Sequence, residues 1–308
     1  MADRAALLRL AGPILTGYLN DQSIWEINCN DNMTCFVKQH TAGGQQKTQV
    51  AHPGIAELER FLVAVGHECH QDFREAKPHL SVGLETLGWR IEAGRPPRSS
   101  QVWMSLRKHP QQLYPLDSFV AREMLTNEQA VALAQAMMDC KVILISGGTG
   151  TGKTSLINAT LHIMKDSPER LVVLQDQPEI LVEVADCTRL AVTKGFTMRD
   201  LVWQALRMDP DRIVIGEVRG GEALDLLHAC KTGHGGLCSI HAESAGDALL
   251  NLEHLVLEVS PDPQRALIAG AIDYIIHMEP HKSIGRCAGI WECHGLDAQG
   301  EYHLERIA

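Results

Sequence analysis

Short apolar runs alternate with segments of helical periodicity along the second part of the chain. The runs are rich in β-branched residues, as in Val142-Ile143-Leu144-Ile145, which is typical of strands buried on both faces. The predicted order is strand 142–146, helix 153–165, strand 171–175, helix 197–207, strand 212–216, helix 221–231, strand 237–241 and helix 244–258. Strands that alternate with helices form mainly parallel sheets, so this part predicts an α/β fold, closed by antiparallel strands near the C-terminus.

The first part of the chain has shorter elements and more turns, which predicts a smaller α+β domain. Its pattern predicts strands at 24–29, 89–94 and 102–108 and a helix at 55–70. Pro110 and Pro115 lie in a loop that we interpret as the interdomain linker. We therefore expect an N-terminal domain at 1–118 and a C-terminal domain at 119–308.

Composition narrows the class of protein. The chain has 308 residues, of which 45% are hydrophobic and 21% charged, as in an ordinary globular protein of two domains. Its net charge of −10 disfavours a protein that wraps nucleic acid. The sequence contains no run of eighteen apolar residues, so it predicts no membrane span. Residues 1–19 are typical of an amphipathic helix rather than a signal peptide. The nine cysteines lack C-x-x-C spacing, so we expect reduced thiols and a cytoplasmic protein.

A glycine-rich segment lies between the first of these strands and its helix. Gly147, Gly152, Lys153 and Thr154 match G-x-x-x-x-G-K-[ST] in full. Glycines let backbone N–H groups turn toward phosphate oxygens, and the helix N-terminus adds unpaired donors. Lys153 would reach the outer phosphates and the Thr154 hydroxyl would hold Mg²⁺. The predicted nucleotide-binding residues are Gly147, Gly148, Thr149, Gly150, Thr151, Gly152, Lys153, Thr154 and Ser155.

Carboxylates follow two other predicted strands. Glu217 comes just after 212–216, at the sheet edge where ligands of open α/β sheets bind, and can orient an attacking water. Asp176 and Glu179 follow the neighbouring strand and could hold a metal through water. The alternatives are a solvated strand-end carboxylate for Glu217 and a turn-forming Asp-x-Pro for Asp176.

Histidines and arginines supply further candidates. His234 and His241 flank the strand at 237–241, and each could donate to a phosphate or to Glu217; the alternative for both is a structural role. Arg207, Arg212 and Arg219 cluster around the strand at 212–216. Arginine suits phosphate and can act across a subunit boundary, so Arg207 and Arg219 are candidates to act in trans.

These motifs, in this order, resemble the traffic ATPases of type IV secretion and bacterial conjugation. These ATPases belong to a wider group that includes the type II secretion and type IV pilus motors. The matching segments are 147–154, the acidic box LQDQPEI, the run LRMDPDRIVIGEVRG, the histidine box TGHGG…SIHAES, and the first-domain segments LNDQSIWEINCN and WRIEAGRPP…SLRK. The last of these is most similar to the conjugal-transfer branch.

The resemblance implies a RecA-like P-loop domain behind a smaller N-terminal domain that covers the nucleotide. It further implies a homohexamer, peripheral at the cytoplasmic face of the inner membrane, that uses ATP and Mg²⁺ beside other secretion-apparatus proteins. On this pattern Glu217 is the catalytic carboxylate, with Asp176, Glu179, His234 and His241 around it. Arg90 and Arg107 match first-domain arginines that contact the phosphates.

Two positions depart from the family pattern, and they keep alternatives open. Gln175 stands where the acidic box usually has glutamate, and Asp209 where arginine is frequent. The leading hypothesis is an ATPase that powers substrate transfer or pilus assembly, with no specific nucleic-acid binding. The alternatives are a hexameric nucleic-acid translocase and a nucleotide-gated assembly platform with low turnover.

Overall fold

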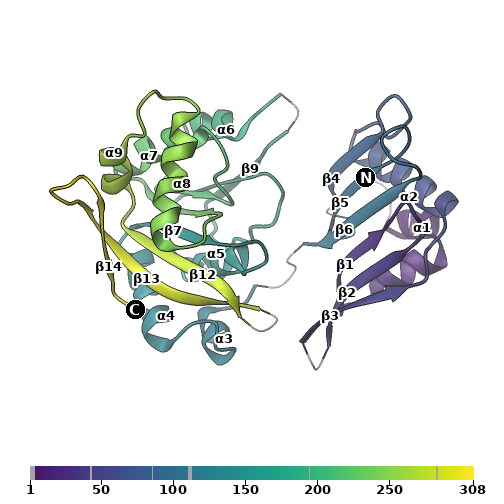
Figure 1. The fold of residues 1–308 in the computed structure, drawn as a ribbon, viewed down its shortest axis with the longest axis horizontal. Helices are drawn as coiled ribbons and strands as arrows, with labels where there is room; N and C mark the ends of the chain where they lie inside the picture. The colour runs from purple at the N-terminus through teal and green to yellow at the C-terminus, as the bar shows by residue number, and fades with distance from the viewer. Residues whose placement is uncertain (1–3, 42–43, 85, 110–112, 194, 282–283) are drawn as a thin grey trace. The chain divides into compact units, whose positions relative to one another are not determined.

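The computed structural model describes residues 4–41, 44–84, 86–109, 113–193, 195–281 and 284–308. Its contacts divide the chain into two units, Met1–Gln111 and Gln112–Ala308 (Figure 1). The boundary expected after residue 118 falls inside helix α3 (Leu116–Ala121), and Leu116 and Phe119 pack into the core of the second unit. Among the described residues, none of the helices combines the length and the apolar character that crossing a bilayer requires.

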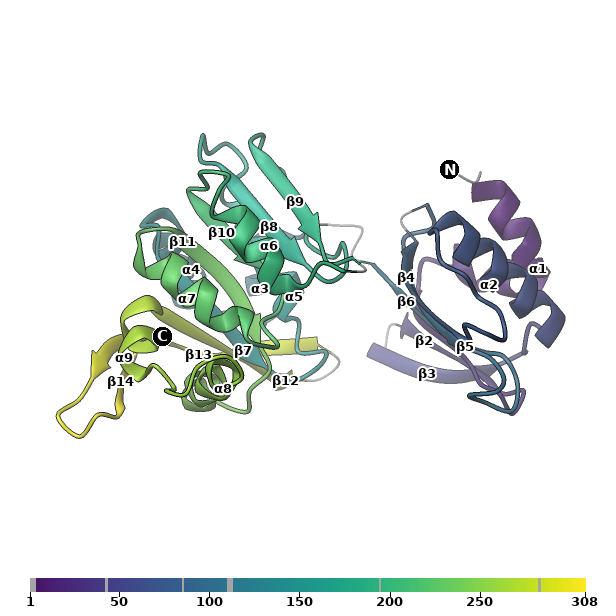
Figure 2. The ribbon, with the colours of Figure 1, turned by 90° about the horizontal axis from the view of Figure 1, so that it is seen from above.

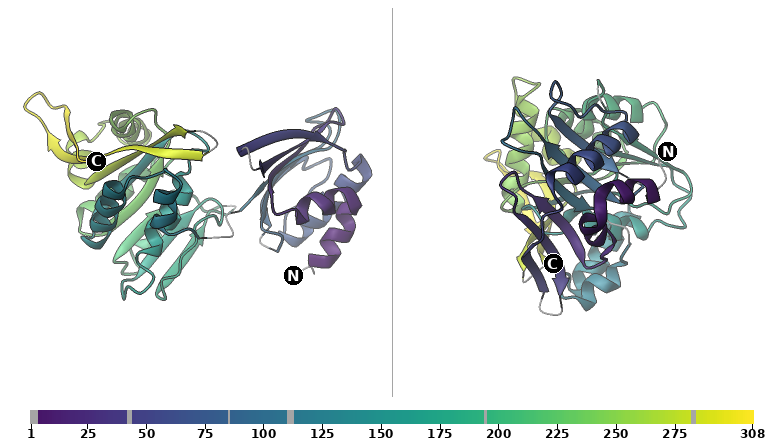
Figure 3. Two further views of the ribbon diagram at one scale, coloured as in Figure 1. Left: turned by 90° about the horizontal axis from the view of Figure 1, so that it is seen from below. Right: turned by 90° about the vertical axis from the view of Figure 1, so that its right-hand side faces the viewer.

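The first unit is an antiparallel sheet in the order β3-β2-β1-β6-β5-β4. Its strands are β1 (Ile24–Cys29), β2 (Cys35–Thr41), β3 (Gly44–Val50), β4 (His79–Leu84), β5 (Trp89–Gly94) and β6 (Trp103–Lys108). Helices α1 (Arg4–Asn20) and α2 (Ile55–Glu68) pack on one face of this sheet, where Leu15, Phe61 and Ile91 are buried together (Figure 3). The predicted strands and the helix of this part are confirmed, and the helix ends two residues earlier than expected.

The second unit is an eight-stranded sheet in the order β14-β13-β12-β7-β11-β10-β8-β9 (Figures 1 and 2). Neighbours are parallel from β12 to β9, and the two C-terminal strands are antiparallel, which confirms the predicted α/β class. The strands are β7 (Val142–Gly147), β8 (Leu171–Gln175), β9 (Cys187–Ala191), β10 (Arg212–Ile215), β11 (Gly235–Ile240), β12 (Tyr274–His281), β13 (Ile284–Leu296) and β14 (Tyr302–Arg306). The apolar pattern had not indicated β9, a partly buried edge strand.

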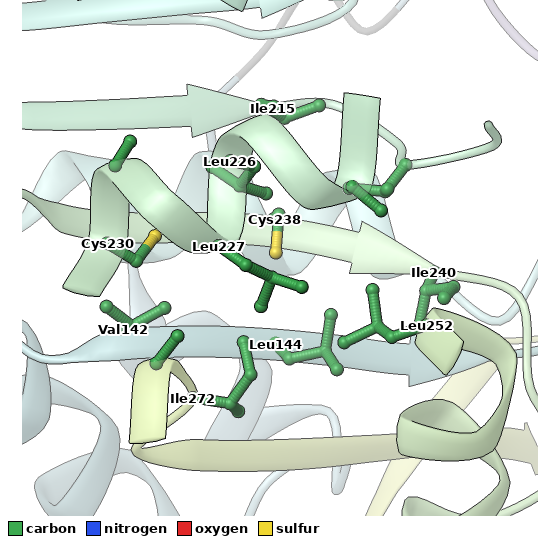
Figure 4. Packing of buried hydrophobic residues seen from close by; sticks show 14 of the residues in the cluster. Val142, Leu144, Ile215, Leu226, Leu227, Cys230, Cys238, Ile240, Leu252 and Ile272 are labelled. Atoms are coloured by element: carbon green, nitrogen blue, oxygen red, sulfur yellow. The ribbon is translucent and has the colours of Figure 1, made fainter. Parts of the chain in front are cut away.

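Helices cover both faces of this sheet. One face carries α6 (Met198–Ala205), α7 (Glu222–Lys231), α8 (Ala245–Leu257) and α9 (Arg265–Ala271), and the other carries α3, α4 (Asn127–Met138) and α5 (Lys153–His162). Alternate residues of β7 face the two layers: Leu144 packs under α7 and α8, as Figure 4 shows, and Ile143 and Ile145 pack under α4 and α5. The sheet is therefore apolar on both sides, and polar side chains gather where its strands end.

Candidate functional site

The glycine-rich loop joins the end of β7 to the start of α5. A Cβ atom on Gly147 would lie 2.2 Å from the Met278 carbonyl oxygen of β12, so only glycine lets these strands approach so closely. Gly152 adopts the left-handed conformation (φ 90°) immediately before α5. Within the described residues no side chain caps this helix, so its first N–H groups stay available to an anion.

Lys153 folds back over the loop. Its Nζ donates to the carbonyl oxygens of Gly147 at 2.8 Å and Gly148 at 3.0 Å, and it lies 3.3 Å from Nδ1 of His241. Burial lowers the pKa of Lys153, and the nearby carboxylate of Glu217 opposes that shift. The buried ammonium is thus held by weak neutral acceptors, where a phosphate oxygen would be a stronger partner.

His241 continues the contacts toward two carboxylates. Its Nε2 lies 2.7 Å from Oε1 of Glu217. The other Glu217 oxygen accepts from Arg219, whose second guanidinium nitrogen donates to Asp176 at 2.9 Å. Lys153, His241, Glu217, Arg219 and Asp176 therefore form one continuous network, which we call the edge network. Its members follow four neighbouring strands, β7, β11, β10 and β8, at their carboxyl ends.

Arg219 was a candidate to act on a neighbouring subunit. Within one chain the structure pairs it with Glu217 and Asp176 instead, and Glu217 is the first cause of its raised pKa. Glu179 lies near this guanidinium, close enough to contribute to the same pKa shift. A trans role for Arg219 would require both of its carboxylate partners to be given up.

Gln175 has a structural role. Its side-chain oxygen accepts hydrogen bonds from the backbone N–H groups of Glu179 and Ile180, both at 3.1 Å, and only 4% of its surface is exposed. The amide thereby fixes the turn that carries Asp176 and Glu179. Asp209 also suits its place, because it adopts a positive φ of 52°, which aspartate tolerates better than arginine.

Three predicted residues lie outside the edge network. His234 precedes β11, and the six residues of that strand, at roughly 3.3 Å each, place it about 20 Å from His241. Its Nδ1 contacts the Ala229 carbonyl at 3.1 Å. Arg212 begins β10, is 1% exposed and pairs with Glu169. Arg207 is exposed in the segment between α6 and β10.

These placements correct the expected arginine cluster, and they leave His241 alone of the two histidines in contact with Glu217 among the described residues. Parallel strands send all their amino ends to one edge of the sheet and all their carboxyl ends to the other. Residues before a strand and after it are therefore held a full strand length apart within one chain, even when they are close in sequence.

Arg90 and Arg107 face each other in the first unit. Arg90 on β5 is directly opposite Arg107 on β6, and Arg107 is in turn directly opposite Glu26 on β1. Glu26 pairs with Lys38 at 2.8 Å, and the described residues offer neither arginine an ion-pair partner. Like charges at opposed positions repel, so this pair would be stabilised by an anion between the guanidinium groups.

Strands β12 and β13 pack against the glycine-rich loop, a contact that the sequence pattern did not indicate. A Cβ atom on Gly285 would lie 1.8 Å from the Thr151 carbonyl oxygen, so β13 packs directly against the loop backbone. On β12, His277 contacts Ser146 beside the loop. A single histidine inside the apolar run YIIHM was the available signal, because buried polar residues need partners.

The fold and the strand-end site define the class, an α/β protein with a RecA-like domain. The model of the type II/IV secretion system protein family matches residues 84–285, which is more than half of the chain. The chain belongs to this family.

Relatives agree with this assignment. The chain is 33% identical to a probable conjugal transfer protein TrbB of Sinorhizobium fredii over 290 residues, covering 93% of this chain and 88% of the relative. It is 35% identical to the conjugal transfer protein TrbB of Rhizobium radiobacter over 264 residues, covering 85% and 81%. The X-ray structure of the Legionella pneumophila ATPase DotB shares the fold, with a TM-score of 0.59 at 16% identity, covering 99% of this chain and 80% of that one.

Proposed function

We propose that this chain binds ATP with Mg²⁺ at the carboxyl edge of the second unit's sheet and hydrolyses it. The energy would power substrate transfer or pilus assembly by a conjugative or type IV secretion apparatus. The observation that carries the proposal is the edge network, in which Lys153 lies 3.3 Å from the histidine that contacts Glu217 at 2.7 Å. Membership of the secretion family supports the same activity.

The loop backbone would bind the phosphates. Residues 148–150 are exposed, and the N-terminus of α5 directs its unpaired N–H groups to the same place. Lys153 would leave the carbonyls of Gly147 and Gly148 for the outer phosphates, which exchanges neutral acceptors for charged ones. The contacting residues would be those of the motif, Gly147, Gly148, Thr149, Gly150, Thr151, Gly152, Lys153, Thr154 and Ser155.

The oxygen donors at this edge fit a hard cation. The Thr154 hydroxyl lies in the first turn of α5, and the Asp176 and Glu217 carboxylates follow the strands beside it. Glu179 would contribute through water. When bound, Mg²⁺ neutralises the charge that develops on the transferring phosphoryl group.

Glu217 would orient the attacking water. Arg219 donates to one of its carboxylate oxygens, and Nε2 of His241 lies 2.7 Å from the other, which has no hydrogen bond of good geometry among the described residues and can accept a proton from water. Movement of Lys153 toward a phosphate would free His241. His241 would then face the outermost phosphate.

The remaining parts of the proposal concern assembly. Arg90 and Arg107 would supply the first unit's contacts to the phosphates. We propose a homohexamer at the cytoplasmic face of the inner membrane, acting with other secretion-apparatus proteins and without specific nucleic-acid binding. Arg207, exposed and without an ion-pair partner among the described residues, remains a candidate to act in trans, and His234 remains a candidate of the histidine box.

Steady-state hydrolysis by the full chain tests the proposal, with Thr154→Val as the metal-site variant and Thr232→Val, at the opposite sheet edge, as its control. We expect Mg²⁺-dependent turnover in the wild type and a higher Mg²⁺ requirement only in Thr154→Val. Tight ATP binding with background turnover would favour the assembly platform, and DNA-stimulated, salt-sensitive turnover would favour the translocase. Native mass measurement with and without ATP tests the hexamer.

A further inference from the structure

One buried histidine, outside the edge network, lies beside two segments that carry members of the network. His277 on β12 is directly opposite Ser146 on β7, with 9% and 0% of their surfaces exposed. Nδ1 of His277 lies 3.0 Å from the Ser146 hydroxyl oxygen. The backbone of Glu243 also approaches the imidazole and acts to raise the pKa of His277, as a carbonyl acceptor does. A single side chain thus connects two segments that are far apart in sequence.

Ser146 has one proton to share between Nδ1 of His277 at 3.0 Å and the Ile276 carbonyl at 3.4 Å. If the hydroxyl donates to the carbonyl, Nδ1–H of the ring donates to Ser146; if it donates to Nδ1, the ring carries its proton on Nε2. Burial is the main cause that lowers the pKa of His277, which favours a neutral ring in either case.

Each partner leads to one side of the candidate site. Ser146 immediately precedes Gly147, the first residue of the phosphate loop, and Glu243 comes two residues after His241. We propose that His277 is a positioning residue that holds the phosphate loop and the His241 segment at the spacing that the reaction needs. The proposal rests on the proposed ATPase function. It assigns His277 no contact with the substrate.

Protonation would fix the direction of this contact. A protonated ring donates from both nitrogens, so Nδ1 could only donate to Ser146, whose hydroxyl lies 3.4 Å from the Ile276 carbonyl and can donate to it. The charges that face the ring are Glu279 on its own strand, Asp247 on α8 and Lys153 on α5. The two carboxylates raise the pKa of His277 and the lysine lowers it, so protonation would set in only below the ordinary value of 6.5.

The test combines a double-mutant cycle with kinetics of the full chain. His277→Phe keeps the size of the ring and removes both hydrogen bonds, and we expect kcat/KM for ATP to fall about tenfold through misplacement of the loop. Ser146→Ala should cause a similar loss, and the double variant should be little worse than either. Ile275→Val, whose side chain packs in the apolar core from the same strand, controls for lost stability and should leave kcat/KM unchanged.

His277→Gln retains one donor and supplies a second readout. It should recover part of the activity, because its amide can still hydrogen bond to one of the partners. Wild-type kinetics in His277→Phe, or additive losses with Ser146→Ala, would overturn the positioning role while leaving the ATPase proposal intact. A wild type that neither binds nor hydrolyses ATP would overturn both.

Discussion

The two edges of the second unit's sheet carry the same kinds of residues and use them differently. At the amino edge Arg212 is buried against Glu169, with 2% of its side chain exposed. At the carboxyl edge Arg219 pairs with Glu217 and remains 54% exposed. The buried pair fixes the start of a strand, whereas the exposed pair can exchange partners when a ligand arrives.

The histidines at the two edges of the sheet differ in the same way as the arginines. His234, before β11, contacts a backbone carbonyl at the end of α7, and His241, after β11, bridges a lysine and a glutamate. The comparison teaches that position relative to a parallel strand, rather than residue type, decides which polar groups can serve chemistry. Matched substitutions at the two edges test this directly.

Lys153→Ala should have the largest effect. It removes the ammonium that we assign to the outer phosphates, so we expect ATP turnover to fall by at least about 100-fold. Lys231→Ala is the amino-edge control, because that lysine donates to the Gly270 carbonyl at 3.2 Å and pairs with none of the carboxylates that the structure describes. Equal losses in both variants, measured in the same hydrolysis assay, would refute the difference between the edges.

The two histidines should differ by a smaller factor. His241→Ala breaks the link between Lys153 and Glu217, and we expect kcat to fall about 10- to 100-fold, within the range for a group that assists proton transfer. His234→Ala should change kcat little in a single subunit. A larger loss that appears only in the assembled oligomer would indicate that this residue acts on a neighbouring subunit.

Glu169→Gln should affect stability rather than activity. It leaves the buried Arg212 with a neutral partner, and we expect the free energy of unfolding to fall by about 2 kcal/mol, below the cost of breaking a fully buried pair. Glu169 retains 30% exposure of its side chain, which moderates the loss. Urea denaturation measures the effect, and kcat per folded molecule should match the wild type.

Arg107→Ala should have the smallest effect. It removes one of the two opposed guanidinium groups, so the affinity for ATP should weaken about 3- to 10-fold, the net contribution of a typical hydrogen bond at this exposed position. The second unit should unfold at the same temperature as before. Titration with a fluorescent ATP analogue measures the affinity, and an unchanged value would exclude the first unit from phosphate binding.

Much of the architecture could be predicted because local patterns determine it. The strand at 171–175 is confirmed residue for residue, since its first four residues are apolar and polar segments bound it. The loop from Gly147 to Thr154 was recognisable from its spacing, and the structure places it between a strand and a helix as expected. Helix α9 and strand β9 lacked such a pattern and were missed.

Pairing of polar groups could not be predicted, because it depends on tertiary contacts. The sequence placed Arg212 and Arg219 in one cluster, and burial separates them to opposite ends of β10. Gln175 read as a departure from a catalytic pattern, whereas its two hydrogen bonds to the backbone give it a structural role. Histidine 277 became a candidate only when strand order placed it beside Ser146.

The most direct measurement of the central claim is ATP affinity and ATP turnover, determined side by side, in Glu217→Gln. The amide keeps the shape of the side chain but cannot take a proton from water. The account predicts an affinity close to that of the wild type and a turnover lower by about 100-fold or more. Wild-type turnover in this variant would contradict it.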